Sequence, residues 1–455
     1  MSNSSKNSVV VTDNATVTIV NVNGNGGGGG NSNGGGPNNS SSTWPGTIQQ
    51  GTAQADAAFD LTLDSKNNIF VTGYSRGNLK ENAHQGNGDI ILVKYNESGS
   101  LQWTQQLGTG GDDWAWGVAT DNSGNAYITG SSQGSLDGNS HAGADDFFLA
   151  KYDSSGNKQW VRLIGTSSTD FGRGLATDGS GNIYVTGFTR GDFDNHTHGG
   201  GSSCWYGNCS NMILIKYNSD GDKQWSKQIS TDGEHEGKDV SVDSAGNVYV
   251  VGYTTGSFTN FSNAGEADYF IIKYDSSGTE QWVRQNGTSG GDSAMGVTVD
   301  GSDIFLIGHT NSSIVGTSAG GWDSFLVKYN SSGVQQWITQ FGTNNHELVY
   351  SGVTSDSKGN IYVTGKILGS WDGYTTKDDI FIAKFDKKGV EQWKKQYGAG
   401  STDASIADEG FSIIADSSDN LYATGFTAGN LDNNTSLGSY DYFIMKIDSS
   451  SGNLL

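Results

Sequence analysis

The 455-residue chain is poor in cysteine, proline, charged residues and long apolar runs, and each shortage excludes something. It has two cysteines and two prolines, and 16% of its residues are charged. No apolar run reaches the roughly 18 residues of a membrane-spanning helix, so the sequence predicts no membrane span. Residues 1–22 lack a basic segment followed by an apolar one, so we expect no Sec signal peptide.

Positive charge is also scarce. The chain has 26 basic and 48 acidic residues, which gives a formal net charge of −22. Without a basic stripe to neutralise phosphates, we expect no nucleic-acid partner. An acidic protein attracts cations, so calcium is the one cofactor that the composition allows us to consider.

Glycine is abundant, with 69 residues, and it marks a repeat. A glycine closes a β-rich run such as Ile-Tyr-Val-Thr-Gly seven times, at intervals of 56 to 65 residues: Gly73, Gly130, Gly187, Gly252, Gly308, Gly365 and Gly425. Both prolines precede the repeats, as expected if most repeat segments are paired strands that need every N–H. A fixed period of this size indicates one supersecondary unit copied and stacked.

Each unit predicts four short strands separated by Asp/Ser/Gly/Asn turns. In the second unit these strands are Trp114–Thr120, Ala126–Gly130, Phe147–Tyr152 and Lys158–Leu163. Four antiparallel strands form one blade of a β-propeller, and seven units close a ring. The sequence therefore predicts an all-β, seven-bladed propeller over residues 44–455.

The two ends of the repeat region predict how the ring closes. A fourth-strand tryptophan occurs in six units, but the seventh unit stops at residue 455 before its fourth strand is complete. Residues 47–52 resemble the ends of the fourth strands in other units. We expect residues 44–52 to supply the missing outer strand and so remove an open sheet edge.

Residues before the repeats have a different composition. Residues 1–22 read as a small β anchor, and residues 23–43 form a Gly/Asn/Ser tract that cannot build a core. We expect a tether of this composition to be flexible and to join the anchor to the propeller.

The repeated signature is Asp-x-x-Gly-Asn-x-Tyr-x-Thr-Gly, followed by Asp-x-Phe-x-x-Lys-Tyr-Asp-x-x-Gly and then Gln-Trp. It resembles the bacterial seven-bladed β-propeller repeat family (SBBP) from residue 44 to 455. The resemblance implies the fold. The family carries no common catalytic residues, so it implies no activity.

The repeat also serves as a control for candidate sites, because a residue present in every unit is expected to hold the unit together. Two acids recur, at the start of the third strand (Asp89, Asp146, Asp268, Asp323, Asp379, Asp441, with Asn211 in unit three) and at the start of the first (Asp56, Asp113, Asp170, Asp292, Asp408). The register gives His235 and Leu348 in units four and six, each with a glutamate beside it. Each set of recurrent acids would form a ring around one face of the propeller. These rings are either cation sites or loop caps that accept backbone N–H bonds, and their recurrence in nearly every unit favours caps. The recurrent third-strand lysines predict an ion pair or a stem packed between blades.

Unit three departs from the repeat in one long loop, residues 191–211. It holds Asp192, Asp194, His196 and His198, followed by Cys204 and Cys209. Alternating His and Asp side chains are weak candidates for a metal site, with the cysteines as further ligands. The alternative is a surface loop closed by a Cys204–Cys209 disulfide.

Aromatic residues outside the repeat are the best ligand-binding candidates. Trp205, Trp322 and Trp371 lie in or beside loops between second and third strands, and Trp114 is placed in a connection between blades. Both kinds of loop emerge on one face of a propeller, where Tyr206, Tyr374 and Tyr440 join them. Exposed aromatics suit recognition and stack on sugar rings. The alternative is that each tryptophan plugs its own loop.

These observations favour a non-catalytic recognition or adhesion head that binds a glycan or surface protein through the loop-rich face. We expect it outside the cell, on a bacterial surface or on a virion such as a phage appendage, with residues 1–43 attached to a larger assembly. One alternative is a structural decoration protein anchored by residues 1–43. The other is a hydrolase or lyase at the channel mouth, for which His235 and Glu236 are the unit-specific acid/base candidates.

Overall fold

The computed structural model describes residues 44–79, 81, 84–194, 196–198, 209–229, 231–371, 378–399 and 407–455. The chain divides into Met1–Ser42 and Thr43–Leu455, and all described residues belong to the second unit. The predicted anchor and linker lie outside the described residues. No helix in the described ranges is long and apolar enough to cross a membrane.

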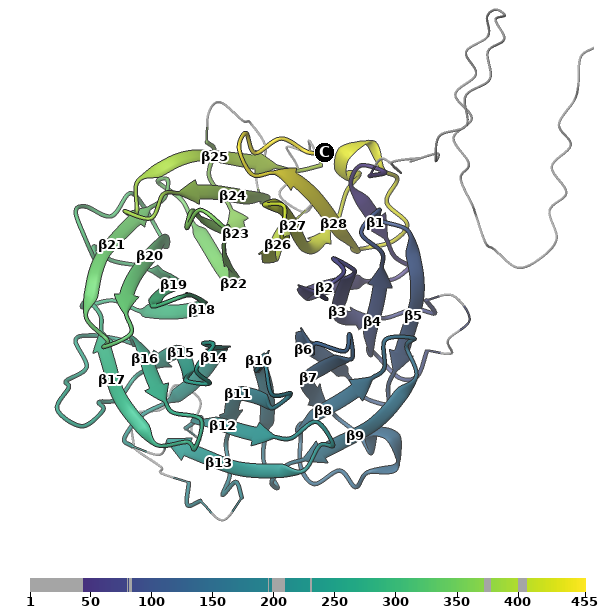
Figure 1. Ribbon diagram of the computed structural model, residues 1–455, viewed down its shortest axis with the longest axis horizontal. Coiled ribbons are helices and arrows are strands. Elements are labelled where there is room, and N and C mark those ends of the chain that lie inside the picture. The colour runs from purple at the N-terminus through teal and green to yellow at the C-terminus, as the bar shows by residue number, and fades with distance from the viewer. Residues whose placement is uncertain are drawn as a thin grey trace, which may run out of the picture. The chain divides into compact units, whose positions relative to one another are not determined.

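Seven four-stranded antiparallel sheets are arranged around a central channel (Figure 1), which confirms the predicted seven-bladed propeller. Blade 1 contains β2 (Asp56–Leu63), β3 (Ile69–Ser75), β4 (Asp89–Tyr95) and β5 (Leu101–Leu107), and blade 2 contains β6 (Asp113–Thr120), β7 (Ala126–Ser132), β8 (Asp146–Tyr152) and β9 (Lys158–Ile164). Blade 3 contains β10 (Asp170–Thr177), β11 (Ile183–Thr189), β12 (Asn211–Tyr217) and β13 (Lys223–Ile229). Blade 4 contains β14 (His235–Val242), β15 (Val248–Thr254), β16 (Asp268–Tyr274) and β17 (Glu280–Asn286). Blade 5 contains β18 (Asp292–Asp300), β19 (Asp303–Thr310), β20 (Asp323–Asn330) and β21 (Gln335–Phe341), and blade 6 contains β22 (Glu347–Ser355), β23 (Ile361–Ile367), β24 (Asp379–Phe385) and β25 (Glu391–Tyr397). Blade 7 contains β26 (Asp408–Ala415), β27 (Asn420–Thr427), β28 (Asp441–Asp448) and β1 (Ile48–Gln50). Short 3₁₀ turns lie at Leu136–Gly138 and Leu431–Asn433.

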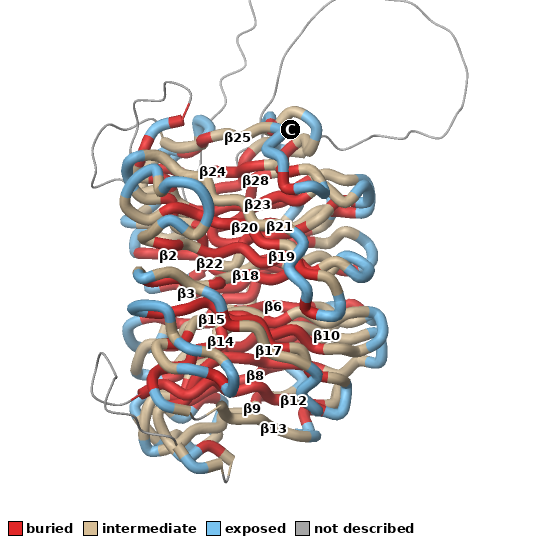
Figure 2. Tube along the Cα trace, turned by 90° about the vertical axis from the view of Figure 1, so that its left-hand side faces the viewer, coloured by how far each residue is buried: buried red, intermediate tan, exposed pale blue. Residues whose placement is uncertain are grey.

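Burial follows the order of strands within a blade. The second and third strands are almost wholly buried, whereas residues of the outer strands and of many turns are partly or fully exposed (Figure 2). The first strand of each blade lies nearest the channel (Figure 1). The repeated glycine sits on the second strand, where the first strand crosses it closely. A Cβ on Gly73 would lie 2.0 Å from the carbonyl oxygen of Ala57, so no larger residue fits there.

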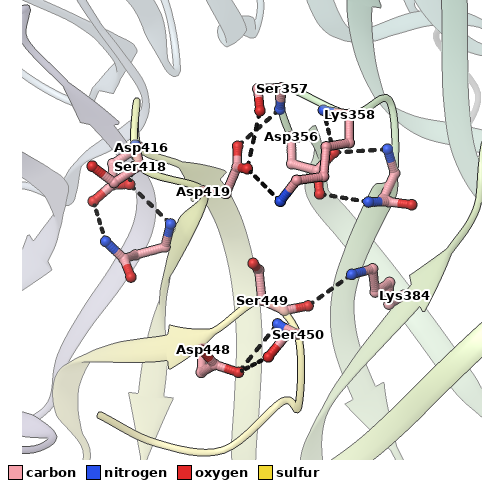
Figure 3. A network of polar contacts seen from close by, with 12 residues as sticks. Asp356, Ser357, Lys358, Lys384, Asp416, Ser418, Asp419, Asp448, Ser449 and Ser450 are labelled. Carbon is pink, nitrogen blue, oxygen red and sulfur yellow. Dashed lines mark hydrogen bonds and ion pairs between the residues drawn. The ribbon is translucent and has the colours of Figure 1, made fainter.

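Neighbouring blades are joined by the recurrent lysine and tryptophan. Lys94 Nζ and Trp103 Nε1 both donate hydrogen bonds to the carbonyl oxygen of Ser154, in a turn of the next blade, at 2.9 and 3.3 Å. Lys384 makes the equivalent bond to Ser449, at the junction shown in Figure 3. The lysine stem also lies over an aromatic ring of its own blade, as Lys94 does over Phe70. The predicted packing between blades is therefore confirmed, with carbonyl oxygens in place of most of the expected ion pairs.

The N-terminal strand closes the ring as predicted. β1 pairs antiparallel with β28 as the outer strand of blade 7. Gln49 Nε2 donates to Asp441 Oδ2 at 2.8 Å, and Gln49 Oε1 accepts the N–H of Leu431. Gln106 makes the same contacts inside blade 1, to Asp89 and Leu79. β1 therefore makes the hydrogen bonds of a fourth strand in blade 7, whose other three strands come from the C-terminal end of the chain.

Candidate binding channel

The recurrent acids are buried caps at the start of the first and third strands. Asp113 accepts the N–H and the hydroxyl of Thr109 at 2.6 and 2.9 Å, and the Ser132 hydroxyl donates to its other oxygen. Burial raises the pKa of Asp113 despite these bonds. This arrangement returns at Asp56, Asp170 and Asp292. The acids therefore support loops, and no group of three or more His, Cys, Asp or Glu within the described ranges is placed to hold a metal ion.

Two blades vary this cap, and one of them corrects the predicted register. In blade 6 the capping residue is Glu347 and not Leu348, because the strand carries one extra residue before Asp356. Glu347 accepts the N–H of Thr343 at 2.6 Å.

In blade 4 the capping position is held by His235, which is completely buried. Its Nε2 lies 2.6 Å from the Thr231 hydroxyl, the partner that the acids use elsewhere. Burial lowers the pKa of His235 to about 4, so the ring is neutral near pH 7. His235 therefore occupies the position of a structural cap in blade 4.

Every first strand has a β-bulge, and the bulge contains the residue that faces the channel. The pairing of β2 with β3 shifts between Ala58 and Asp60, which leaves Phe59 unpaired. The other six inner strands shift at the corresponding place. Bulges re-aim side chains, and they are common beside binding sites. The seven bulge residues all line one cavity: Phe59, Trp116, Arg173, Lys238, Met295, Tyr350 and Phe411.

This channel cavity has a volume of about 510 Å³, within the range of small-ligand sites. Its deeper wall is mainly aliphatic, including Leu61, Val118 and Val240, with hydroxyl groups from Ser351 and Ser412 among them. The first residue of the inner strand is an acid in six blades, whereas the seven bulge residues include aromatic, basic and thioether side chains. Within the inner strands, the position that lines the channel therefore varies more in chemistry than the capping position does.

Four of the bulge residues form a stacked aromatic arc across blades 6, 7, 1 and 2. Tyr350 stacks on Phe411 with ring centroids 4.0 Å apart, and Phe59 stacks on Trp116 at 4.1 Å. Phe411 and Phe59 join the two pairs at 5.0 Å. Such stacked rings fix one another's positions. The arc is a rigid wall built before any ligand arrives.

The opposite part of the wall is charged. The Arg173 guanidinium lies 4.2 Å from the ring centroid of Trp116 and so ends the aromatic arc. Lys238 Nζ pairs with Glu236 Oε2 at 2.6 Å. Lys238 and Arg173 together hold the pKa of the Glu236 carboxyl below its usual value despite its burial.

Two aspartates also line the cavity, but each is used to join blades. Asp60 accepts the N–H of Val118 at 2.9 Å and the Ser412 hydroxyl at 2.7 Å. Asp239 accepts the N–H of Val297 at 2.9 Å. Burial raises the pKa of Asp60 to about 6 and that of Asp239 to about 7.

The predicted aromatic residues separate into two groups. Trp114 lies within β6 and not in a connection between blades, and it stacks on Tyr74 with centroids 5.1 Å apart. Tyr440 packs edge-on to Phe426, which contacts Phe411 of the channel arc. Trp114 also contacts Phe59, so both predicted residues adjoin the same aromatic cluster.

Trp322 and Trp371 lie in their own blades, away from the channel wall. Trp322 packs edge-on against His309 at 5.1 Å. Trp371 is only 5% exposed and packs against Phe381, so it plugs its loop and is not the exposed recognition residue that was expected. Trp205, Tyr206 and Tyr374 lie outside the described residues.

The described part of the long unit-three loop is held by its own polar side chains. Asp194 bonds to Lys223 and to Ser226. His198 Nε2 lies 2.6 Å from the carbonyl oxygen of Cys209, and Asp192 accepts the N–H of His198. His196 Nε2 lies 3.4 Å from Ser226 Oγ. Cys209 is buried and disulfide-bonded, but Cys204 lies outside the described residues, so the predicted pairing stays a prediction.

Sequence reasoning missed the channel-facing residues because they lie inside the first strands, where every position was assumed to serve only the repeated fold. The signal was present in the register. The third residue after the capping position is large in six units but is aromatic in some, basic in others and methionine in one: Phe59, Trp116, Arg173, Lys238, Met295 and Phe411. Variation at one position of an inner strand is what a channel site requires.

Comparison with known sequences agrees with this architecture. The beta-propeller repeat family SBBP matches residues 102–137, 159–194, 224–259 and 336–370. Four segments of the chain therefore match this repeat, and the structure that contains them is a propeller. Each match begins in the fourth strand of one blade and ends after the second strand of the next, so the sequence repeat is offset from the structural blade.

Two curated proteins resemble the chain distantly. An uncharacterized WD repeat-containing protein, L264, of Acanthamoeba polyphaga mimivirus is 23% identical over 77% of the chain and 34% of its own length. Regulatory protein FlaEY of Caulobacter vibrioides is 26% identical over 33% of the chain and 17% of its own length. The chain thus spans about a third or less of the length of these relatives.

Solved structures show similar propellers at low identity. The β-propeller domain of the trilobed protease from Pyrococcus furiosus has a TM-score of 0.45 and 9% identity, and the match covers 88% of this chain and 97% of that one. The Pan2 WD40 domain from Neurospora crassa has a TM-score of 0.48 and 8% identity, over 85% and 88% of the two chains.

Proposed function

We propose that this propeller is a non-catalytic recognition module that takes part of its ligand into the central channel. The observation that carries the proposal is the channel wall itself, where seven bulge residues of different chemistry line one cavity of about 510 Å³. A largely apolar cavity with a few polar groups is the usual form of a small-ligand site. The ligand is either a free molecule or the terminal group of a glycan or surface protein.

The loop-face alternative is less well supported. Trp371 is buried and Trp322 packs on its own blade, whereas Trp114 and Tyr440 adjoin the channel cluster. The enzyme alternative also has less support. His235 is a buried cap beside Thr231 and does not line the channel cavity, and Asp60 and Asp239 accept backbone N–H groups.

A cavity-filling variant tests the channel directly. Met295→Trp adds bulk to the cavity at a bulge position where blade 2 already carries Trp116, so the blade is expected to tolerate it. Val390→Trp is the control, because Val390 is 55% exposed in an outer turn. We expect ligands found on a glycan array and a fragment panel to bind the wild type and Val390→Trp, but at least about 10-fold more weakly to Met295→Trp. A ligand that binds all three proteins equally would place recognition elsewhere.

Attachment to a larger surface or virion assembly is a further part of the proposal and rests on residues 1–43. The full chain and a chain lacking residues 1–43 differ only in that segment, so both are compared for retention on the source cells or particles. Equal retention would make the segment a tail with no anchoring role.

A further inference from the structure

Arg173 stands out among the residues of the channel wall because its guanidinium forms no ion pair within the described part of the chain, although the more distant Glu236 carboxylate interacts with it electrostatically. Its Nε is buried and has no hydrogen-bond partner. No carboxylate of the described residues lies within ion-pair distance of its guanidinium, and the nearby Glu236 is instead held by Lys238 at 2.6 Å. The Arg173 side chain as a whole is half-buried, but a buried N–H without a partner is unfavourable.

The position of the guanidinium is nevertheless fixed. It lies 4.2 Å from the ring centroid of Trp116 and 5.2 Å from that of Phe171, so two aromatic rings from neighbouring blades contact it. Phe59 covers Trp116 with centroids 4.1 Å apart and a 7° angle between the planes. The guanidinium therefore has its orientation set by packing, while its Nε–H is left without a partner. This is how a site is preorganised for a ligand.

The charges around Arg173 are shared among several groups. Lys238 and Glu236 form a pair of their own, and Glu234, also buried, lies close enough to Lys238 to affect its ionisation. The two acids that line the cavity, Asp60 and Asp239, are held by backbone N–H groups, and burial raises the pKa of Asp60 to about 6 and that of Asp239 to about 7. Below about pH 6 both acids are largely protonated, so neither carboxylate that lines the cavity repels an incoming monoanion.

We propose that Arg173 binds a carboxylate of the ligand, whose planar or apolar body then lies in the channel cavity. A guanidinium offers two parallel N–H donors that match the two oxygens of a carboxylate. The aliphatic lower wall, with Leu175 and Val297, receives the apolar body. A dianionic phosphate suits the site less, because the chain carries a net charge of −22 and only Arg173 is unpaired here. This inference rests on the proposed channel function.

The probes are 2-naphthoate and its uncharged amide, 2-naphthamide, titrated calorimetrically into the full chain. We expect the carboxylate to bind at least about 10-fold more tightly than the amide, which corresponds to one charge-assisted pair. Arg173→Gln should remove this preference, and Arg173→Lys should restore part of it. Arg284→Gln is the matched control, because Arg284 also lies over a tryptophan, Trp282, but on an outer strand. Thermal unfolding of each variant confirms that it is folded.

The outcomes separate the two proposals. Equal binding of the two probes, blocked by Met295→Trp, would leave the channel as a binding site and overturn the role of Arg173. A preference for the carboxylate that survives in Arg173→Gln would also overturn it. Binding of neither probe at millimolar concentration would count against the carboxylate and the channel site together.

Discussion

The first residue of each inner strand and the bulge residue that follows it lie within one short segment, yet they behave oppositely across the seven blades. The first position holds Asp56 and its counterparts, with Glu347 and His235 as variants. Each of these three side chains bonds to the threonine four residues before it in its own blade. The bulge position holds residues as different as Trp116, Lys238 and Met295. The capping residue always contacts other parts of the propeller, and its side-chain chemistry is nearly constant. The bulge residue faces the channel, so its side chain is free to differ from blade to blade, and we infer that the ligand determines which residue stands there.

The largest expected effect is a loss of stability when the capping residue at the start of an inner strand is replaced. Asp170→Ala removes the acceptor for the N–H and hydroxyl of Thr166 and for the Thr189 hydroxyl, all at a buried site. Because these donors lose a partner that water cannot replace, we expect a loss of about 2–4 kcal/mol in the free energy of unfolding. Chemical denaturation measures it.

Binding sharpens the same comparison. The affinity of folded Asp170→Ala for 2-naphthoate should match that of the wild type, whereas Arg173→Gln should lose affinity and keep its stability. If Asp170→Ala lost affinity while still folded, the two positions would not be independent.

The closing strand gives the next effect in size. Gln49→Ala removes bonds to Asp441, Gly429 and Leu431 that join the N-terminal strand to blade 7. We expect a loss of about 1–3 kcal/mol, because the N–H of Leu431 is left unpaired in a buried place. Gln159→Ala, on an exposed position of β9, is the control and should change the unfolding free energy by less than about 0.5 kcal/mol. Equal losses in both variants would mean that closure adds no stability of its own.

The fold was predictable because its information is repeated. Seven copies of each turn and of the Gly73 position average out local ambiguity, and the absent fourth strand of unit seven pointed to residues 44–52. The register error at Leu348 arose where one blade carries an extra residue, which a strict spacing cannot detect. The channel site escaped prediction because a β-bulge is not visible in a single copy of an alternating pattern, and only the bulge turns Phe59 and Arg173 toward the channel.

The smallest effect is a dependence of stability on pH. Burial raises the pKa of Asp408 to about 6 and that of Asp239 to about 7, so the folded state favours their protonated forms. Their contribution to stability is complete below pH 4 and is lost as the pH rises through 6 to 7. His235 acts with the opposite sign, because its lowered pKa of about 4 costs stability as the pH falls from 6.5 toward 4.

Between pH 4 and 6 the two acids outweigh the one histidine, so these groups make the unfolding free energy highest near pH 4 and lower by about 1–2 kcal/mol at pH 8, since channel water screens Asp239. Asp239→Asn should flatten the decline between pH 4 and 7. A stability that rises over that interval in the wild type would show that these acids are ionised in the folded protein at low cost.

The central claim is that the non-repeating channel wall, and not the repeated blade surface, receives the ligand. The indole N–H signals of the tryptophans test it in a ¹⁵N-resolved NMR titration with 2-naphthoate, assigned by single Trp→Phe variants. Trp116 Nε1 has no hydrogen-bond partner beside the channel, whereas Trp103 and Trp225 donate to carbonyl oxygens of the next blade. We predict that the Trp116 signal shifts with ligand while the Trp103 and Trp225 signals stay in place. Movement of the blade signals with an unchanged Trp116 signal would contradict the account.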